Sequence, residues 1–340
     1  MEFFPELIGN GSTKNRIGSS ILSGRIPHAF LIDGDAGSGK TTLALGIAAA
    51  LNCEGGKDVL PCGECGVCKR IKRRGHPDVK LLEKSRERAS IGVSEVKELR
   101  ADMFLSATEA RYKVYIISDA DKLTPEAQNA LLIVLEEPPP SVVIILLCEG
   151  TDKILTTVKS RTQYIAMSRF SRSELSTYVG AISAEAERLM RLDPEKFDTV
   201  IAESGGVIGR ALELIDPERS REVKERRDDI LAVISAISPK RSYAELHSAF
   251  VSLPTKRQDT LSALEELLRA LSDMIKHKRA PGAEPVFFRD AESIENACAE
   301  MSEKHLLAVY ELVLATHETI TKNAGIAAAL AKLASEIKLI

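Results

Sequence analysis

The sequence predicts two structural classes in one chain: an α/β domain built on a parallel sheet, followed by segments that are wholly helical. Short β-branched and apolar runs alternate with helical stretches up to about residue 167. After Ser168 these runs stop, and apolar residues recur at spacings of three and four, as from Leu261 to Leu271. Aromatic residues make up only 4% of the chain and Trp is absent, which favours cores of Leu, Ile, Val and Ala.

Five segments of the first part are predicted to be strands: 28–33, 79–82, 114–118, 142–148 and 164–167. The run VVIILLC at 142–148 is typical of a strand buried on both faces, as in a parallel sheet covered by helices. A helix is predicted over 123–137, because Thr124 is a good N-cap, Pro125 suits the first turn and Pro138 ends it. The break at Asp216-Pro217 divides the helical part, so we expect domains at residues 1–167, 168–216 and 217–340.

Length, charge and hydropathy exclude several classes of protein. The chain of 340 residues is long enough for two or three domains. Its 46 Lys and Arg against 49 Asp and Glu give a net charge of −3, so any contact with nucleic acid must come from a local patch or a partner. The longest apolar run is far shorter than the ~20 residues of a membrane span. The N-terminal residues lack the pattern of a secretion signal, and we expect a cytoplasmic protein without a membrane anchor.

A phosphate-binding loop directly follows the first predicted strand. Residues 34–42 read GDAGSGKTT and match GxxxxGK[ST], with Gly34, Gly37 and Gly39 allowing backbone N–H groups to surround phosphate oxygens. Lys40 is predicted to reach the β- and γ-phosphates, and the Thr41 hydroxyl to ligate Mg²⁺. The preceding strand and following helix favour this interpretation over a chance glycine-rich turn. We therefore expect ATP or ADP with Mg²⁺ as a ligand.

Four of the six cysteines, Cys53, Cys62, Cys65 and Cys68, form a candidate metal site within residues 53–68. The two-residue gaps let neighbouring thiolates surround one ion, and four sulfurs complete a tetrahedral shell, which predicts a structural Zn²⁺ site. An iron–sulfur cluster is the alternative, but the fourth Cys of a ferredoxin motif does not follow. The other two cysteines, at 148 and 298, are expected to be buried core thiols.

A basic run, KRIKRR at residues 69–74, follows the cysteines. It could contact nucleic-acid phosphates, but no aromatic residue is interleaved with it. A solvated helix face is therefore the preferred interpretation.

Four motifs together resemble bacterial clamp-loader subunits of DNA polymerase III, within the AAA+ family. They are RIPHAF at 25–30 before the phosphate loop, the four-cysteine insert, AQNALLIVLEEPPP at 127–140, and Ser160-Arg161-Thr162. The resemblance spans about residues 1–215 and is strongest to the delta-prime type. It implies an AAA+ nucleotide-binding domain, a small helical lid and a C-terminal helical collar used for oligomerisation.

Three departures separate the chain from the ATP-hydrolysing gamma/tau type that it otherwise resembles. Where active members end an apolar strand in Asp-Glu, this chain has Ser118 and Asp119, so the charge that favours Mg²⁺ and the longer acidic side chain are both missing. Asp121 is expected to face solvent or to cap the next helix. Glu149 stands where the motor subunits place a polar Thr near the γ-phosphate, and a carboxylate there would repel phosphate. Arg210 lies one position later than the nucleotide-contacting Arg of motor subunits, a rotation of ~100° on a helix.

Arg161 is the strongest functional candidate outside the phosphate loop. The resemblance implies that it projects to the nucleotide of the adjacent subunit, as an arginine finger acting in trans. The alternative is an ordinary ion pair within the chain.

The resemblance implies a stator: a component of the DNA polymerase III holoenzyme with weak or absent ATPase activity of its own. It would assemble with gamma/tau and delta subunits to place the sliding clamp on primed DNA. One alternative is an ATP-hydrolysing motor of the gamma/tau type, relying on Lys40 and Thr41. A stand-alone phosphate-loop kinase is the weakest interpretation, because a second acidic Mg²⁺ ligand is missing.

Overall fold

The computed structural model describes residues 1–340 except 56–57, 85–89, 281–284, 286, 289–290 and 323. The chain forms two compact units, Met1–Asp216 and Pro217–Ile340. Within the described residues, no helix is both long enough and apolar enough to cross a membrane.

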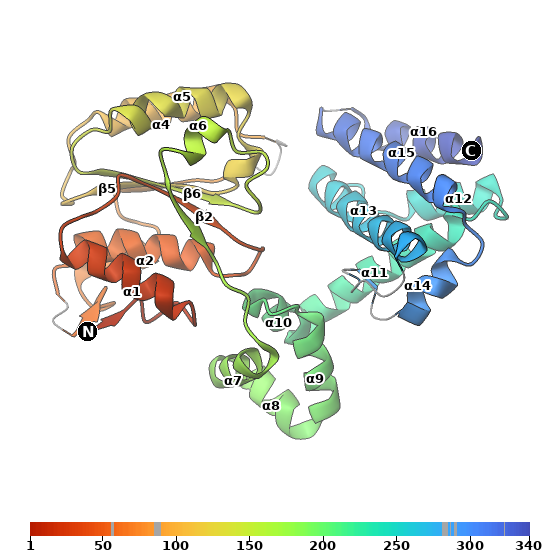
Figure 1. Cartoon of the computed structure of the whole chain (residues 1–340), viewed down its shortest axis with the longest axis horizontal. Coiled ribbons are helices and arrows are strands. Elements are labelled where there is room, and N and C mark those ends of the chain that lie inside the picture. The colour runs from red at the N-terminus through yellow and green to blue at the C-terminus, as the bar shows by residue number, and fades with distance from the viewer. Residues whose placement is uncertain (56–57, 85–89, 281–284, 286, 289–290, 323) are drawn as a thin grey trace. The chain divides into compact units, whose positions relative to one another are not determined.

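The first unit contains a five-stranded parallel sheet with the strand order β4-β5-β6-β2-β7 (Figure 1). The strands are β2 (Ala29–Asp33), β4 (Val79–Leu82), β5 (Lys113–Ile117), β6 (Val142–Cys148) and β7 (Gln163–Ala166). All five predicted segments are strands, with ends within one residue of the prediction. Asp33, the last residue of β2, lies opposite Cys148 in β6. The sheet order makes β6 the central strand and places β2 directly beside it, between β6 and the edge strand β7.

Helices cover both faces of this sheet (Figure 1). On one face lie α1 (Gly11–Leu22), α2 (Lys40–Asn52) and α3 (Gly66–Lys72), and on the other α4 (Val93–Met103), α5 (Pro125–Glu136) and α6 (Thr156–Lys159). Side chains alternate between two apolar cores: Ile32 packs with the α2 side, whereas Leu31 packs with the α5 side. Every residue of β6 is buried, as the apolar run predicted. The predicted α/β domain is therefore confirmed.

Local signals account for the α5 boundaries. Thr124 is the N-cap, its Oγ1 accepting a hydrogen bond from the Ala127 N–H at 3.2 Å, and Pro125 is the first helical residue. Between β5 and α5 lies a single turn of 3₁₀-helix, η1 (Ala120–Lys122).

A short parallel pair outside the main sheet joins β1 (Glu2–Phe3) to β3 (Val59–Leu60). The sequence did not predict it, because strands of two residues carry no periodicity.

Four helices complete the first unit: α7 (Arg172–Ile182), α8 (Ala184–Leu192), α9 (Pro194–Glu203) and α10 (Ile208–Ile215). They have an apolar core of their own, which includes Leu175, Phe197 and Ala211. A capping box between Ser171 and Glu174 begins α7. We call these four helices the lid helices.

The second unit is helical throughout its described residues. It comprises α11 (Pro217–Ile237), α12 (Tyr243–Val251), α13 (Arg257–Arg279), α14 (Ala291–Cys298), α15 (Glu303–Thr321) and α16 (Ile326–Lys338). Helix α13 packs against α15, and α12 against α16. Leu264, Leu267 and Leu271 are buried in one core, so the predicted apolar face of α13 is confirmed. Cys298 is buried in the same core, as expected.

Candidate functional site

The phosphate loop connects the end of β2 to the start of α2, at the carboxyl edge of the sheet. Gly37 and Gly39 adopt φ values of +78° and +94°, a region that other residues enter only with strain. Lys40 begins α2, and its Nζ donates hydrogen bonds to the carbonyl oxygens of Gly34 at 2.6 Å and Asp35 at 2.9 Å. Thr41 follows as the second residue of α2 and is partly buried. The loop thus brings together the residues predicted to bind nucleotide.

A carboxylate lies beside the lysine of this loop. Glu149 follows β6, and its Oε1 is 3.8 Å from Lys40 Nζ. The loop is held against β6, because the Gly34 N–H donates to the Cys148 carbonyl at 3.2 Å. The pKa of the Glu149 carboxyl lies above its ordinary value, mainly because of burial. The Asp121 carboxylate raises this pKa further, whereas Lys40 lowers it. Cys148 itself is buried in β6, the core thiol that the sequence predicted.

The segment after β5 carries the modified acidic motif. Ser118 directly follows β5 and Asp119 adopts a left-handed backbone with φ of 52°, so both lie at the same sheet edge as the phosphate loop. The expectation for Asp121 is wrong on both counts. Its side chain is only 9% exposed, and its Oδ1 accepts a hydrogen bond from the Glu149 N–H at 3.4 Å, whereas Thr124 caps the next helix.

The lid helices contact the phosphate loop through backbone atoms. The Gly209 N–H in α10 donates to the Gly37 carbonyl at 3.0 Å. A Cβ on Gly209 would lie 2.6 Å from Gly37 Cα, so only glycine permits this approach. Arg169 adds a bidentate ion pair with Asp35, at 2.7 and 2.9 Å, which lowers the pKa of the Asp35 carboxyl. Arg210 is exposed.

Sequence reasoning missed this contact. Of the residues at the start of α10, only Arg210 carries a prediction from the sequence. The signal that could have found it is the pair of glycines, Gly37 and Gly209, because two backbones can approach closely only where both lack a side chain.

Arg161 lies after α6, and its contacts are with α5 and α6. Its Nη2 is 2.9 Å from Glu136 Oε1, and its Nη1 donates to the Thr157 carbonyl at 3.1 Å. The intrachain ion pair weighed from the sequence is therefore present. The Arg161 and Glu136 side chains are 37% and 51% exposed, and an ion pair of this kind is worth at most about 1 kcal/mol, so Arg161 can exchange Glu136 for another anion.

A buried glutamine connects α5 to the segment that carries Arg161. Gln128 Nε2 donates to the carbonyls of Leu123 and Lys153, and its Oε1 accepts from the Leu155 N–H at 2.8 Å. Leu155 is the N-cap residue of α6. The amide therefore fixes the start of the helix that precedes Arg161.

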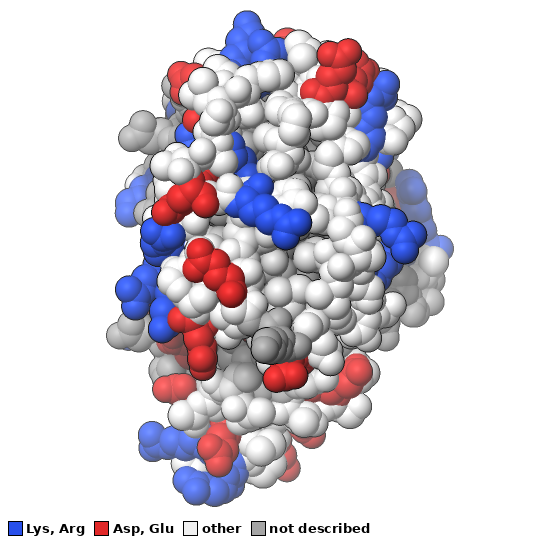
Figure 2. Space-filling model, turned by 90° about the vertical axis from the view of Figure 1, so that its left-hand side faces the viewer, with Lys and Arg blue, Asp and Glu red and all other residues white. Residues whose placement is uncertain are grey.

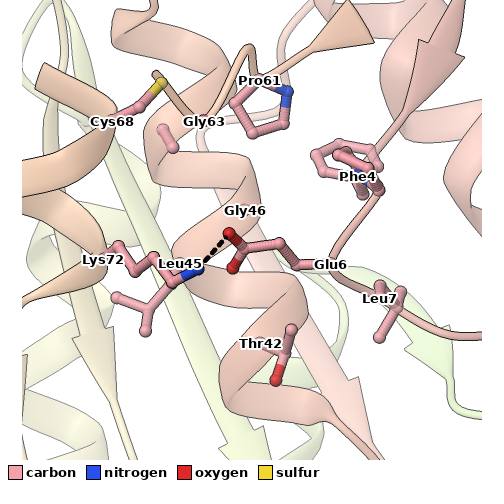
Figure 3. Close-up of a pocket in the computed structure, with 12 residues that line it drawn as sticks. Phe4, Glu6, Leu7, Thr42, Leu45, Gly46, Pro61, Gly63, Cys68 and Lys72 are labelled. Atoms are coloured by element: carbon pink, nitrogen blue, oxygen red, sulfur yellow. Dashed lines mark hydrogen bonds and ion pairs between the residues drawn. The ribbon is translucent and has the colours of Figure 1, made fainter. Parts of the chain in front are cut away.

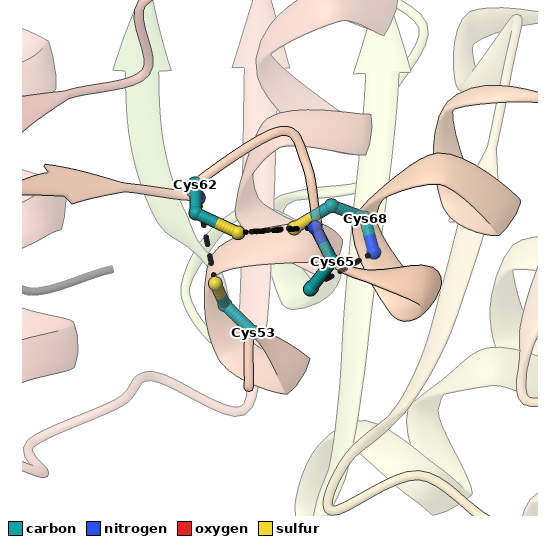
Figure 4. A group of neighbouring side chains, drawn as sticks. All are labelled: Cys53, Cys62, Cys65 and Cys68. Atoms are coloured by element: carbon teal, nitrogen blue, oxygen red, sulfur yellow. Dashed lines mark hydrogen bonds between the residues drawn. The ribbon is translucent and has the colours of Figure 1, made fainter. Parts of the chain in front are cut away.

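The four predicted metal ligands converge on one point (Figure 4). The Sγ atoms of Cys53, Cys62, Cys65 and Cys68 all lie within 4.8 Å of one another. The Cys62 and Cys68 sulfurs are 3.9 Å apart, close to the ~3.8 Å edge of a tetrahedron with metal–sulfur bonds of about 2.3 Å. The cysteine cluster can therefore bind a metal ion, and its all-sulfur donor set fits a closed tetrahedral site.

Backbone N–H groups stabilise thiolates within the cysteine cluster. The Cys68 N–H donates to Cys65 Sγ at 3.4 Å. Burial would raise the pKa of the Cys65 thiol, but hydrogen bonds from the N–H groups of Cys68 and Glu54 and from the neighbouring thiols lower it to about 6. Burial raises the pKa of Cys53. Such N–H···S bonds are typical of thiolates that are ready to receive a metal.

A small cavity lies between the N-terminal segment, α2 and the cysteine cluster (Figure 3). Its volume is about 110 Å³, and Phe4, Leu45 and Pro61 line it. Lys72 Nζ pairs with Glu6 Oε1 beside it at 2.7 Å. Because pockets for small molecules begin at ~300 Å³, this cavity is too small to hold a nucleotide.

The basic run after the cysteines is paired with acidic residues of the same chain. Arg70 contacts Glu109 at 3.0 Å, and Arg74 contacts Glu83 at 2.9 Å. Figure 2 shows positive and negative side chains interspersed over one face of the molecule. These contacts favour the solvated-face interpretation over a nucleic-acid contact.

Comparisons with known proteins agree with the motifs. A family model described as DNA polymerase III, delta subunit, matches residues 9–171. DNA polymerase III subunit tau of Bacillus subtilis is 28% identical over 91% of this chain and 56% of that protein. The delta' subunit of the same organism is 29% identical over 66% of this chain and 64% of that protein. The gamma subunit of Buchnera aphidicola subsp. Schizaphis graminum is 30% identical over 63% and 57%.

The chain spans about half the length of the first curated relatives that it matches. Among solved structures, a gamma-subunit-related protein of Thermotoga maritima aligns over 96% of this chain and 98% of its own, with 16% identity and a TM-score of 0.45. The sequence matches and the parallel-sheet fold with its phosphate loop agree on one assignment. Over residues 9–171 the chain is therefore similar to DNA polymerase III subunits of the delta, gamma and tau types.

Proposed function

We propose that this chain is the delta-prime-type stator of a clamp loader. It would assemble with gamma/tau and delta subunits in the cytoplasm and help to place the sliding clamp on primed DNA. Its own ATPase activity would be weak or absent. The observation that carries the proposal is the altered acidic motif: Ser118 and Asp119 lie at the sheet edge where hydrolysis needs an Asp-Glu pair, and Glu149 lies beside Lys40.

We infer that Arg161 is the group this chain supplies to the neighbouring subunit's nucleotide. Its guanidinium is partly exposed and weakly paired with Glu136, so an incoming phosphate can replace the carboxylate. The buried Gln128 holds the start of α6 and so keeps Arg161 in a defined place. A preorganised guanidinium of this kind stabilises the charge that develops during phosphoryl transfer.

We also propose that the cysteine cluster holds a structural Zn²⁺. Four thiolates leave no open coordination position, so the ion would join the end of α2 to α3 without taking part in chemistry. The intact Gly34, Gly37, Gly39, Lys40 and Thr41 support binding of ATP or ADP with Mg²⁺ at the phosphate loop.

The test is ATP turnover by the loader reconstituted with gamma/tau and delta. In Arg161→Ala, ATP turnover at the site that receives this arginine should fall by ~10³-fold or more. The total DNA-stimulated hydrolysis of the loader should therefore drop by at least the fraction that this site contributes. Assembly, measured as complex mass, should not change. Arg172→Ala, which removes an arginine that is 62% exposed in α7, is the matched control. Unchanged turnover in Arg161→Ala would contradict the assignment.

The gamma/tau-type motor remains the second candidate, because the B. subtilis tau relative matches over 91% of this chain and Lys40 is intact. Lys40→Ala introduced in this subunit alone separates the two functions. The stator predicts nearly unchanged turnover of the assembled loader, whereas a motor predicts a large loss.

A further inference from the structure

Glu149 has a position that bears on which nucleotide the phosphate loop accepts. Its carboxylate is 3.8 Å from Lys40 Nζ, and its backbone N–H is held by Asp121. The next residue, Gly150, has φ of +97°, and its N–H donates to Asp33 Oδ1 at 2.8 Å. Hydrogen bonds from two successive N–H groups thus fix the backbone of this turn beside the loop, and the half-exposed Glu149 side chain reaches from it to Lys40.

The lysine of a phosphate loop marks the position of the outer phosphates. Its ammonium lies between the β- and γ-phosphates of a bound triphosphate. A carboxylate 3.8 Å from that ammonium is therefore placed to meet the charge of a γ-phosphate bound at Lys40. The β-phosphate is also held by the loop's own N–H groups, whereas the γ-phosphate depends more on Lys40, Mg²⁺ and its surroundings.

Charge then distinguishes the two nucleotides. A γ-phosphate brings added negative charge toward Glu149, and the neutral Ser118 gives Mg²⁺ no carboxylate in compensation. A diphosphate places its terminal charge on the N–H groups of the loop and leaves Lys40 in contact with Glu149. We propose that Glu149 makes this phosphate loop select nucleoside diphosphates over nucleoside triphosphates. This inference rests on the proposed binding of nucleotide at the loop.

The selection also has a consequence for the proposed stator. If the loop retains a diphosphate and rejects a triphosphate, the nucleotide bound to it does not change with the ATP concentration. The subunit would then keep one conformation while its neighbours exchange nucleotide. Glu149 is a specificity-determining residue in this scheme and takes no part in bond breaking.

The experiment titrates the full chain with fluorescent analogues of ADP and ATP in the presence of Mg²⁺. The wild-type chain should bind ADP about five- to tenfold more tightly than ATP, a ratio expected for like charges at a partly exposed site. Glu149→Gln, which keeps the shape and removes the charge, should bring the two affinities to within about threefold by strengthening ATP binding. Glu149→Thr should behave in the same way. Asp152→Asn removes an exposed carboxylate from the same loop and should leave the ratio unchanged.

Three results would overturn the inference while leaving nucleotide binding intact. The first is equal affinity of the wild-type chain for ADP and ATP, and the second is an unchanged ratio of these affinities in Glu149→Gln. The third is weaker ATP binding in Glu149→Gln, which would make Glu149 a Mg²⁺ ligand. If neither the wild-type chain nor Glu149→Gln binds either nucleotide, both the inference and the proposed nucleotide binding fail. The stator assignment is tested separately through Arg161 in the reconstituted loader.

Discussion

Gly209→Ala should separate the lid helices from the phosphate loop. The new Cβ would lie 2.6 Å from Gly37 Cα and 2.8 Å from the Gly37 carbonyl oxygen, about 1 Å inside ordinary carbon–carbon contact. Both obstacles are backbone atoms, so no side chain can move aside. The substitution also loses the 3.0 Å hydrogen bond between the two residues. Because α10 can move away from the loop, only this contact is lost. The unfolding free energy should therefore decrease by about 1–3 kcal/mol.

The assay is urea unfolding of the full chain, together with amide hydrogen exchange of the phosphate loop and of α10. Exchange should accelerate in both segments of Gly209→Ala. Gly180→Ala is the matched control, because its Cβ would meet only the flexible Met190 side chain, at 3.6 Å. Within α7, where Gly180 lies in the last turn, Ala should stabilise the helix by up to ~0.5–1 kcal/mol. Wild-type stability and unchanged exchange in Gly209→Ala would refute the proposed contact.

Further predictions concern charges and the cysteine cluster. The Asp102 carboxyl is buried in part, but hydrogen bonds from Tyr115, Lys80 and Lys113 lower its pKa to about 2, below the ordinary 3.8. The Asp102 carboxylate therefore stabilises the fold above pH 4, and this stabilisation is lost as the pH falls toward 2. Asp102→Asn should lower the free energy of unfolding by about 1–2 kcal/mol at pH 7, and by less at pH 3, in urea titrations. Arg169→Ala should cost under ~1 kcal/mol in the same assay, because its ion pair is exposed. Cys65→Ser should lower the metal content by elemental analysis and the melting temperature, and unchanged metal content would exclude Cys65 as a ligand.

Much of the fold was predictable because its signals are local. The phosphate loop, the β6 segment and the Thr124 N-cap each depend on residues within a few positions of one another, and the structure places all of them as predicted. The cysteine cluster was also predictable, because its spacing within 53–68 keeps the four side chains within reach of one ion. The β1–β3 pair was missed, since its strands are too short to show alternation.

The contacts around the candidate site connect segments that are separated in the chain. Glu149 meets Lys40 because β6 pairs with β2, and Gly209 meets Gly37 because the lid helices fold back on the loop. Arg161 meets Glu136 because α5 and α6 pack together.

By itself, the sequence determined which residues are candidates to bind phosphate and metal, because backbone torsions and short spacings act locally. It also determined that the second unit is helical, because apolar periodicity is a property of each helix. Only the tertiary structure decided how close the Glu149 carboxylate lies to Lys40 and which glycine lies on the loop. Those neighbours depend on the order in which strands pair and helices pack, and chain order alone does not specify that order.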